Sequence, residues 1–237
     1  MSIFAPVAEA QAEKDTLGGF VALPSSVYNM IIKMWYETRT RKGGLAFNLE
    51  FETVDGKKLK TVIYPTSKKS GKEKTTYTDK EGKEVYLADF LTANSLAVMA
   101  TGKQLHELTP KAKMVKLRDP VSKQEVPTSV PVYTEALGKP VKLGVLRVLE
   151  NKTVKSGDEY VPTNDMKQSN RIDKVFNAKT NQTIVELNAN VPAEFQAVWL
   201  EKNDGKDVDN FKPVEAQNTL GAASTAPVAT TSLFDEE

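Results

Sequence analysis

The sequence predicts a mainly β fold, a β-barrel with α+β elaboration, from three observations. Several segments alternate apolar and polar residues and are separated by short turns that contain Gly. One central segment instead repeats its apolar residues at helical spacing. Both ends of the chain lack either pattern and carry excess acids. We therefore expect one ordered domain at 21–205, a flexible N-terminal arm at 1–20 and a disordered acidic tail at 206–237.

Three strands are expected at the start of the ordered domain. The first is LPSSVYNMIIKMWYETRT, whose β-branched and aromatic residues favour a strand, although SSVYNMIIKMWYE would also fit one or two helical turns. After the turn KGG, the segment LAFNLEFETV places Leu45, Phe47, Leu49 and Phe51 on one face. The hairpin signal DGKK precedes a return strand, LKTVIYPT. Together these segments predict an antiparallel meander.

The next two segments differ sharply in apolar content. After Pro65 the chain is rich in Lys and poor in apolar residues, and Gly71 and Gly82 predict turns in an extended hairpin or a long loop. The segment LADFLTANSLAVMATGKQLHEL then predicts a helix, in one or two pieces, and Gly102 is a typical helix stop.

Strands are expected again from KAKMVKLRD through KPVKLGVLRVLENKTV. Further on, RIDKVFNAKTNQTIVEL predicts a hairpin, PAEFQAVWLEKNDG a short helix, and SGDEYVPTNDMKQSNRID a polar loop. This order is compatible with an elaborated OB-type barrel, which has five strands and a helix between the third and fourth. It is equally compatible with other α+β arrangements.

The composition argues against an enzyme. The chain has no Cys, which removes disulfides and thiolate chemistry and fits the cytoplasm. Its single histidine, His106, lies in no catalytic motif, and no phosphate-binding glycine loop is present. No catalytic residue, cofactor or metal is therefore expected; a metal-dependent nuclease built on Asp158, Glu159, Asp165 and Asp173 is the weakest alternative. Neither a membrane span nor a secretory signal is predicted.

The net charge of +1 conceals an asymmetry along the chain. Residues 31–187 carry 28 Lys and Arg against 19 Asp and Glu, whereas the remaining residues carry 4 against 12. A basic body with acidic ends is typical of a protein that binds a polyanion.

Aromatic residues are interleaved with the basic ones. Single-stranded nucleic acid needs cations for its phosphates and flat rings for its bases. The candidate residues for this binding are Trp35, Tyr36, Arg39, Arg41, Lys42, Lys58, Lys60, Tyr64, Lys68, Lys69, Lys72, Lys74 and Tyr77. The alternative is that the lysines only protect strand edges and that Trp35 and Phe47 are core residues. Tyr64 and Tyr77 have too few apolar neighbours in the sequence to be buried.

The chain ends in a small-residue run followed by SLFDEE. A tail that serves only solubility does not need bulky apolar residues, so we expect this one to dock. It would occupy the basic groove when no nucleic acid is present and, once displaced, recruit partners. The docking residues are Leu233, Phe234, Asp235, Glu236 and Glu237.

Four stretches of the sequence resemble the OB-fold single-stranded-DNA-binding proteins that tailed bacteriophages encode. They are DTLGGFVALPSSVYNMIIKMWY, YLADFLTANSLAVMATGKQLHEL, KPVKLGVLRVLENKTVKSGDEYVPT and NRIDKVFNAKTNQTIVE, and the acidic tail is similar as well. The resemblance implies coating of single-stranded DNA in replication, recombination or repair, in the cytoplasm of a host cell. It also implies that the tail contacts a polymerase, helicase or recombinase. Tails of this kind often end on the aromatic, whereas this one ends on acids, and the resemblance leaves a homo-oligomer open.

Two other functions remain open from the sequence. The chain could be a transcription or recombination accessory factor that acts through its tail on a polymerase. It could also be a virion or scaffold component without a nucleic-acid role, which would assemble with itself and not bind oligonucleotides.

Overall fold

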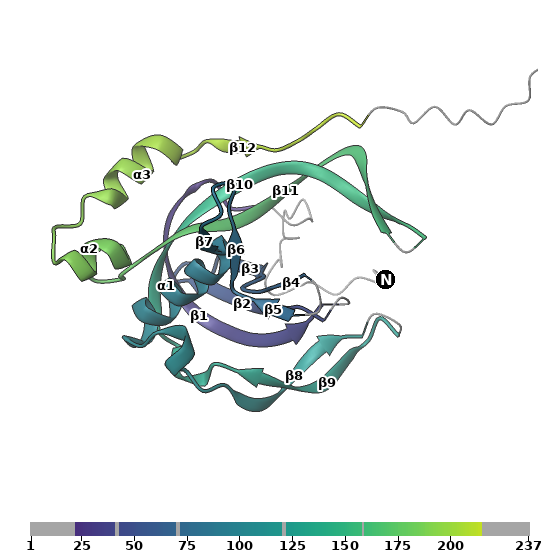
Figure 1. Cartoon of the computed structure of the whole chain (residues 1–237), viewed down its shortest axis with the longest axis horizontal. Coiled ribbons are helices and arrows are strands. Elements are labelled where there is room, and N and C mark those ends of the chain that lie inside the picture. The colour runs from purple at the N-terminus through teal and green to yellow at the C-terminus, as the bar shows by residue number, and fades with distance from the viewer. Residues whose placement is uncertain (1–21, 41–42, 70–71, 120–121, 158, 215–237) are drawn as a thin grey trace, which may run out of the picture.

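The computed structural model describes residues 22–40, 43–69, 72–119, 122–157 and 159–214. Its main sheet has the hydrogen-bonded order β11-β10-β1-β2-β3, and all neighbours in this path are antiparallel (Figure 1). These strands are β1 (Ser26–Arg39), β2 (Leu45–Thr53), β3 (Lys58–Ile63), β10 (Pro140–Ser156) and β11 (Glu159–Phe176). The predicted mainly β fold and the meander of three strands are confirmed. The expected arm at 1–20 and the end of the chain after Val214 lie outside the described residues.

The sheet has three further strands at its margins. β8 (Lys111–Arg118) and β9 (Glu125–Val132) form a hairpin that joins β1 where Val132 pairs with Tyr36. β12 (Asp207–Asp209) runs parallel to β10. Residues 206–214 are therefore not all tail, and the predicted boundary at 206 is too early. Among the described strands no closed barrel forms, because β3 and β11 stand at the two ends of the path.

The lysine-rich segment forms two small hairpins. One pairs β4 (Ser67–Lys69) with β5 (Lys72–Lys74), and the other pairs β6 (Thr76–Thr78) with β7 (Glu84–Tyr86). Gly82 turns the second hairpin with a positive φ of 83°. The prediction of an extended hairpin in this segment is correct in kind, although the chain splits it into two.

The predicted helix is α1 (Ala88–Thr101), followed by the 3-10 turn η1 (Leu105–Glu107). Gly102 ends α1 in the left-handed conformation that glycine adopts without strain. Leu96, Ala93 and Ala97 face the interior and are fully buried. The predicted helix is confirmed, and of the two arrangements left open, one piece or two, the structure has an α-helix followed by a separate 3-10 turn.

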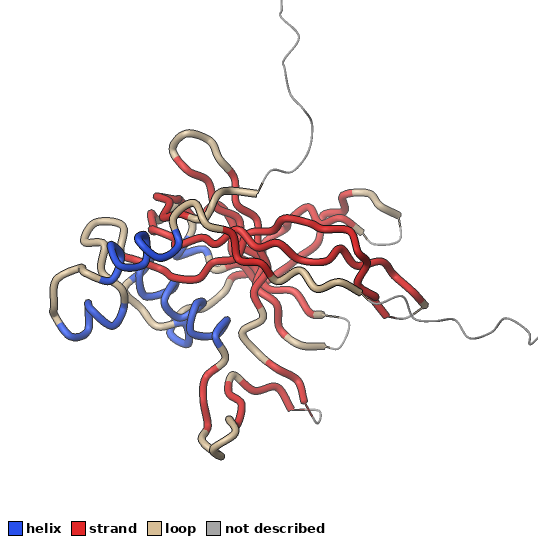
Figure 2. The backbone as a smooth tube through the Cα atoms, turned by 90° about the horizontal axis from the view of Figure 1, so that it is seen from above, coloured by secondary structure: helices blue, strands red, loops and turns tan. Residues whose placement is uncertain are grey.

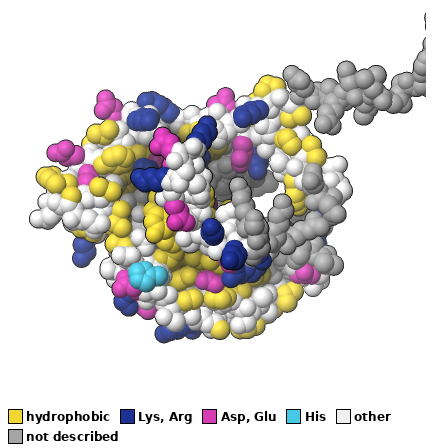
Figure 3. All heavy atoms as spheres, viewed as in Figure 1, with side chains coloured by type: hydrophobic (Ala, Val, Ile, Leu, Met, Phe, Trp, Pro, Cys, Tyr) yellow, Lys and Arg dark blue, Asp and Glu magenta, His cyan; other side chains and the backbone are white. Residues whose placement is uncertain are grey.

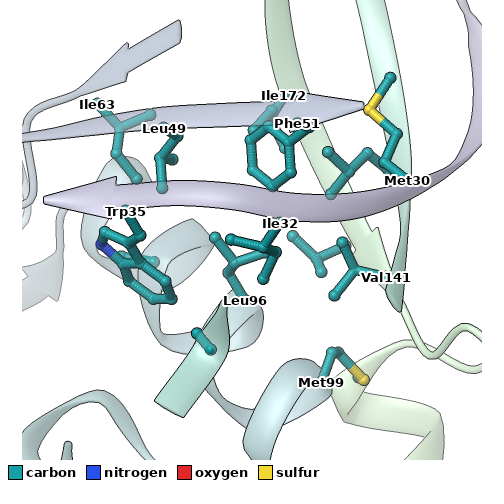
Figure 4. Packing of buried hydrophobic residues seen from close by; sticks show 14 of the residues in the cluster. Met30, Ile32, Trp35, Leu49, Phe51, Ile63, Leu96, Met99, Val141 and Ile172 are labelled. Atoms are coloured by element: carbon teal, nitrogen blue, oxygen red, sulfur yellow. The ribbon is translucent and has the colours of Figure 1, made fainter. Parts of the chain in front are cut away.

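The core lies between α1 and the inner face of the sheet. In Figure 4, Leu96 of α1 lies beneath Ile32 of β1, and Phe51 of β2 lies on the other side of the β1 ribbon. Trp35 lies at one end of this cluster and is completely buried. The alternation in LAFNLEFETV therefore does place Leu49 and Phe51 inward, as the sequence predicts.

A second, smaller core covers the outer face of β10 and β11. There α3 (Phe195–Asn203) packs Trp199 against Leu146, Val148 and Phe176. The Trp199 indole N–H also donates to the Asp173 carboxylate at 2.7 Å. The helices gather on one side of the strands, as Figure 2 shows. The predicted short helix near the end of the body is confirmed.

Two predictions for this part of the chain are wrong. TIVEL forms no strand, because Thr183 caps a helix, α2 (Ile184–Ala189), in a reciprocal capping box with Glu186. The described residues of SGDEYVPTNDMKQSNRID form no polar loop, because β11 pairs with β10 almost throughout this stretch. None of the helices in the described part of the chain is long and apolar enough to cross a membrane.

Candidate nucleic-acid interface

The outer face of the meander carries an aromatic residue among polar ones. Tyr36, Asn48 and Val62 form one cross-strand row over β1, β2 and β3, and Glu50 and Lys60 are paired in the next row. These residues line a cavity of about 400 Å³, which Ser169 and Asn170 of β11 complete. Burial and the Glu50 carboxylate raise the pKa of the half-buried Tyr36, so its phenol stays protonated near neutral pH.

The Trp35 candidate is wrong as a stacking residue. The side chain points inward and is 0% exposed, with its ring centroid 5.8 Å from that of Phe47 and 4.9 Å from that of Tyr133. Its neighbour Tyr36 points to the opposite face, because successive side chains of a strand alternate. Tyr36 is thus the only one of the two that has surface to offer a base.

Glu73 fixes the hairpin β4–β5 against the end of β1. One guanidinium nitrogen of Arg39 donates to both carboxylate oxygens of Glu73, at 2.9 and 2.8 Å. The hydroxyl of Thr66 and the backbone N–H of Leu45 donate to the same carboxylate. These hydrogen bonds, that of Thr66 above all and then that of Arg39, lower the pKa of Glu73 to about 2.

This arrangement places the lysines of the hairpin beside the β1–β2 turn. The Lys68 ammonium lies over Gly43, 3.0 Å from the position that a Cβ would take there. Lys68, Lys72 and Lys74 are exposed and form no ion pair with another described residue. Three positive charges on one hairpin therefore remain available to a polyanion.

Two predicted cations are already paired. Arg39 is held by Glu73, and the Lys60 ammonium lies 2.7 Å from a Glu50 oxygen. A phosphate would have to compete with these carboxylates, so Arg39 and Lys60 are weaker candidates than the unpaired lysines. Lys58 is exposed and is not paired within the described part of the chain.

The remaining candidates divide into exposed residues and residues without a described side chain. Tyr64 and Tyr77 are about half exposed, at 51% and 50%, so the prediction that the body does not bury them is confirmed. They lie on separate segments, Tyr64 after β3 and Tyr77 in the hairpin β6–β7. Arg41 and Lys42, the side chain of Lys69, and the tail residues Leu233 to Glu237 lie outside what the structure describes.

The structure adds basic residues on two hairpins that were not among the predicted binding residues. The long hairpin β10–β11 extends beyond the core, and the hairpin β8–β9 diverges from β1 after its single paired position. Both extend toward the same side of the molecule as the β1–β2 turn (Figure 1). The exposed basic residues of the hairpin β8–β9 are Lys111, Lys113, Lys116, Arg118 and Lys123. Those of the hairpin β10–β11 are Lys152, Lys155 and Lys167.

The basic character of the hairpin β8–β9 could have been recognised in the sequence. KAKMVKLRD carries four cations within eight residues, Lys111 and Lys113 on one face of the strand and Lys116 and Arg118 on the other. On β11, Tyr160 adds an aromatic side chain that is 70% exposed. In Figure 3 the visible face is hollowed near its centre, and Lys and Arg side chains lie around the hollow.

The described residues hold no group of three or more His, Cys, Asp or Glu that could bind a metal ion. Of the acids named for a nuclease, Asp173 is engaged with the Trp199 indole, and Asp165 lies eight positions away along β11. His106 lies exposed in η1, far from these acids in sequence.

In comparisons with known proteins, no family model matches the chain and no curated protein sequence matches it. The case for a function therefore depends on the residues and the geometry described above.

Proposed function

We propose that the protein binds single-stranded DNA without catalysis and coats it during phage DNA replication or recombination. The observation that carries this proposal is the set of exposed, largely unpaired cations on three hairpins at the side of the molecule where the β1–β2 turn lies, together with the sheet face that presents Tyr36. Phosphates would contact the hairpin lysines, and bases would stack on Tyr36 and on the exposed tyrosines. Such binding tolerates any sequence, because every base has a flat face.

The order of the strands supports an OB-like barrel that is left open. β1, β2 and β3 form the meander, α1 follows, and β10 and β11 return with β10 beside β1. An OB-fold has this order of five strands with a helix after the third. The hairpin β8–β9 is then an insertion between the helix and the fourth strand. OB-folds bind oligonucleotides on the face of strands 2 and 3, where the Tyr36 cavity lies.

The fold also favours single strands over duplex DNA. A duplex reader presents polar side chains on a helix that enters the major groove. Here the cations of the proposed interface lie on hairpins, and α1 carries Asp89 as its one charged residue. The interface therefore suits single-stranded DNA, whose bases are unpaired and whose sugar-phosphate backbone is flexible.

The C-terminal tail is proposed to recruit a replication or recombination protein such as a polymerase, helicase or recombinase. This role is suggested by Leu233 and Phe234 next to three acids, which fit an anchor on a basic, partly apolar surface. If the chain instead acts only as an adaptor through its tail, it will show no affinity for oligonucleotides.

The test is fluorescence anisotropy of a labelled oligo-dT, titrated with the full-length chain at several salt concentrations. We expect binding that weakens steeply with salt, because each neutralised phosphate releases counterions. The triple variant Lys68→Glu, Lys72→Glu, Lys74→Glu should weaken binding at least tenfold for every oligonucleotide sequence.

A matched control makes the same change of charge elsewhere. Lys139→Glu, Lys179→Glu, Lys202→Glu alters three exposed lysines near the helices instead of the hairpins. It should weaken binding much less than the hairpin variant. Equal losses in both variants would mean that only net charge matters, and no binding by the unaltered chain at low salt would refute the proposal.

A further inference from the structure

A large apolar groove lies on the helical side of the molecule, away from the Tyr36 cavity. It has a volume of about 1040 Å³ and lies between α1, α2, α3 and β11. These elements lie side by side at one side of the molecule in Figure 1. Most of the accessible surface in the groove is apolar, which is characteristic of a ligand or peptide site.

The apolar side chains that line this groove are unusually exposed. Leu91 of α1 is 49% exposed, Val185 of α2 is 72% exposed, and Val198 of α3 is 59% exposed. Phe195, at the start of α3, is 39% exposed. Large aliphatic residues from three different helices thus face one shared hollow, and such a grouped patch marks an interaction surface.

Of the two cations that line the groove, one forms no ion pair with a described residue. Arg171 and Lys174 both line it, and the Arg171 guanidinium forms no ion pair with a described residue. The acids there are mostly engaged. Glu186 accepts the backbone N–H groups of Glu194 and Phe195 at 2.8 and 2.7 Å.

Three other acids line the groove, and one of them, Glu194, is exposed with its carboxylate in no ion pair among the described residues. Asp89 accepts the backbone N–H of Tyr64 at 2.7 Å. Asp173 accepts the Trp199 indole N–H and lies 3.8 Å from the Lys174 ammonium. An occupant of the groove should therefore be apolar, and any negative charge that it carries should lie beside Arg171 and away from Glu194.

We propose that the groove binds the C-terminal segment of the same chain, with Leu233 and Phe234 in the apolar hollow and the acids 235–237 beside Arg171. This segment combines two bulky apolar residues with three adjacent acids. The proposal does not depend on DNA binding. It also differs from the expectation that the tail occupies the basic surface, because this groove gathers apolar side chains from three helices in one hollow.

The length of the tail fits this site. The body ends at Val214, whose backbone N–H and C=O both bond the Asn164 side chain of β11. From Asn164 to Arg171 is seven positions of β11, at most about 23 Å. A flexible coil of 18 residues, the number from 215 to 232, would have a root-mean-square span of about 21–25 Å.

Because the C-terminal segment is covalently tethered to the body, it needs only a weak affinity for the groove to occupy it. Effective concentration is greatest when the span of a linker matches the distance between the sites, and for a short linker it is on the order of millimolar. A dipeptide anchor with only millimolar affinity would then occupy the groove in about half of the molecules. A partner protein that binds the tail would have to compete with the groove, so docking also sets the availability of the tail.

Disulfide trapping in the full-length chain tests the proposal, because the chain has no cysteine of its own. Ser232→Cys is combined with Val198→Cys, and a mild oxidant is added without DNA. We expect an intrachain disulfide, seen as a shifted monomer band on a non-reducing gel. Adding Phe234→Ala should lower its yield at least threefold, and excess free TSLFDEE peptide should lower it too.

The control pairs Ser232→Cys with Val54→Cys in the β2–β3 turn, where the side chain is 92% exposed. This more accessible position should give a much lower yield. Equal yields at both positions, or a yield that Phe234→Ala leaves unchanged, would overturn the proposal. Interchain disulfides alone would also overturn it, since the occupant would then be a second copy. The oligo-dT titration is a separate readout, so failure here leaves the proposed DNA binding untouched.

Discussion

The Trp199 indole lies against the backbone of Gly144, so closely that a Cβ at Gly144 would come within 3.2 Å of two ring carbons. The same Cβ would lie 3.3 Å from the Cβ of Lys174. Contacts this short are tighter than side chains normally make in a packed interior. The absence of a side chain at position 144 is therefore what lets α3 pack on the outer face of β10 and β11.

Gly144→Ala should destabilise the protein by about 1–3 kcal/mol through overpacking. In the Trp199→Ala background the same change should cost much less, because the ring that it meets is gone. Urea unfolding of the two single variants and the double variant measures this coupling. Gly44→Ala is the control, since a Cβ there meets only the Thr40 hydroxyl at 3.4 Å. Additive losses in the double variant would contradict the packing argument.

Glu73→Gln should lower the free energy of unfolding by about 1 kcal/mol at pH 7, a small value because the site is partly exposed to water. The pKa of Glu73 is lowered from 4.5 to about 2, so the carboxylate stabilises the folded state above pH 4.5. This contribution is lost as the pH falls from about 4.5 to about 2. The difference between Glu73→Gln and the unaltered chain should therefore shrink over that range in urea unfolding. Glu81→Gln, in the exposed turn of β6–β7, should have no comparable effect at either end of the range.

Tyr36 and Trp35 are adjacent and should respond in opposite ways. Tyr36→Ala should weaken oligo-dT binding by about 1–3 kcal/mol while leaving thermal stability nearly unchanged, and Tyr36→Phe should keep most of the affinity. Trp35→Ala should instead cost about 3–5 kcal/mol of stability, because it empties a fully buried site. Anisotropy and thermal melting on the same samples separate the two effects. A Tyr36→Ala variant with full affinity would remove this face from the proposed interface.

Much of the fold could be predicted because local patterns and tertiary contacts agree. The alternation in LAFNLEFETV, the apolar spacing in α1 and the glycine at position 102 each indicate the element that forms. The helix α2 was missed because TIVEL is β-branched and follows a turn. The capping pair of Thr183 and Glu186 was the signal that outweighs this propensity.

The site was harder to predict, because the sequence does not reveal which lysines are paired. The Lys60–Glu50 pair depends on strand register, and the Arg39–Glu73 pair joins residues 34 positions apart. The extension of β11 was missed because polar residues on both faces of a strand look like a loop in the sequence. Such a strand is held by its partner strand instead of by a core.

The hairpin β8–β9 provides the last prediction, since its cations were not among the expected binding residues. Lys113→Ala with Lys116→Ala should weaken oligo-dT binding and flatten its salt dependence. For single strands, each lost phosphate contact lowers the slope of log affinity against log salt by about 0.7. The slope should thus fall by up to about 1.4, while the Lys68, Lys72 and Lys74 contacts remain. Lys103→Ala with Lys139→Ala is the matched control near α1 and should leave the slope unchanged. An unchanged slope in the β8–β9 variant would show that DNA contacts the β4–β5 side of the sheet alone.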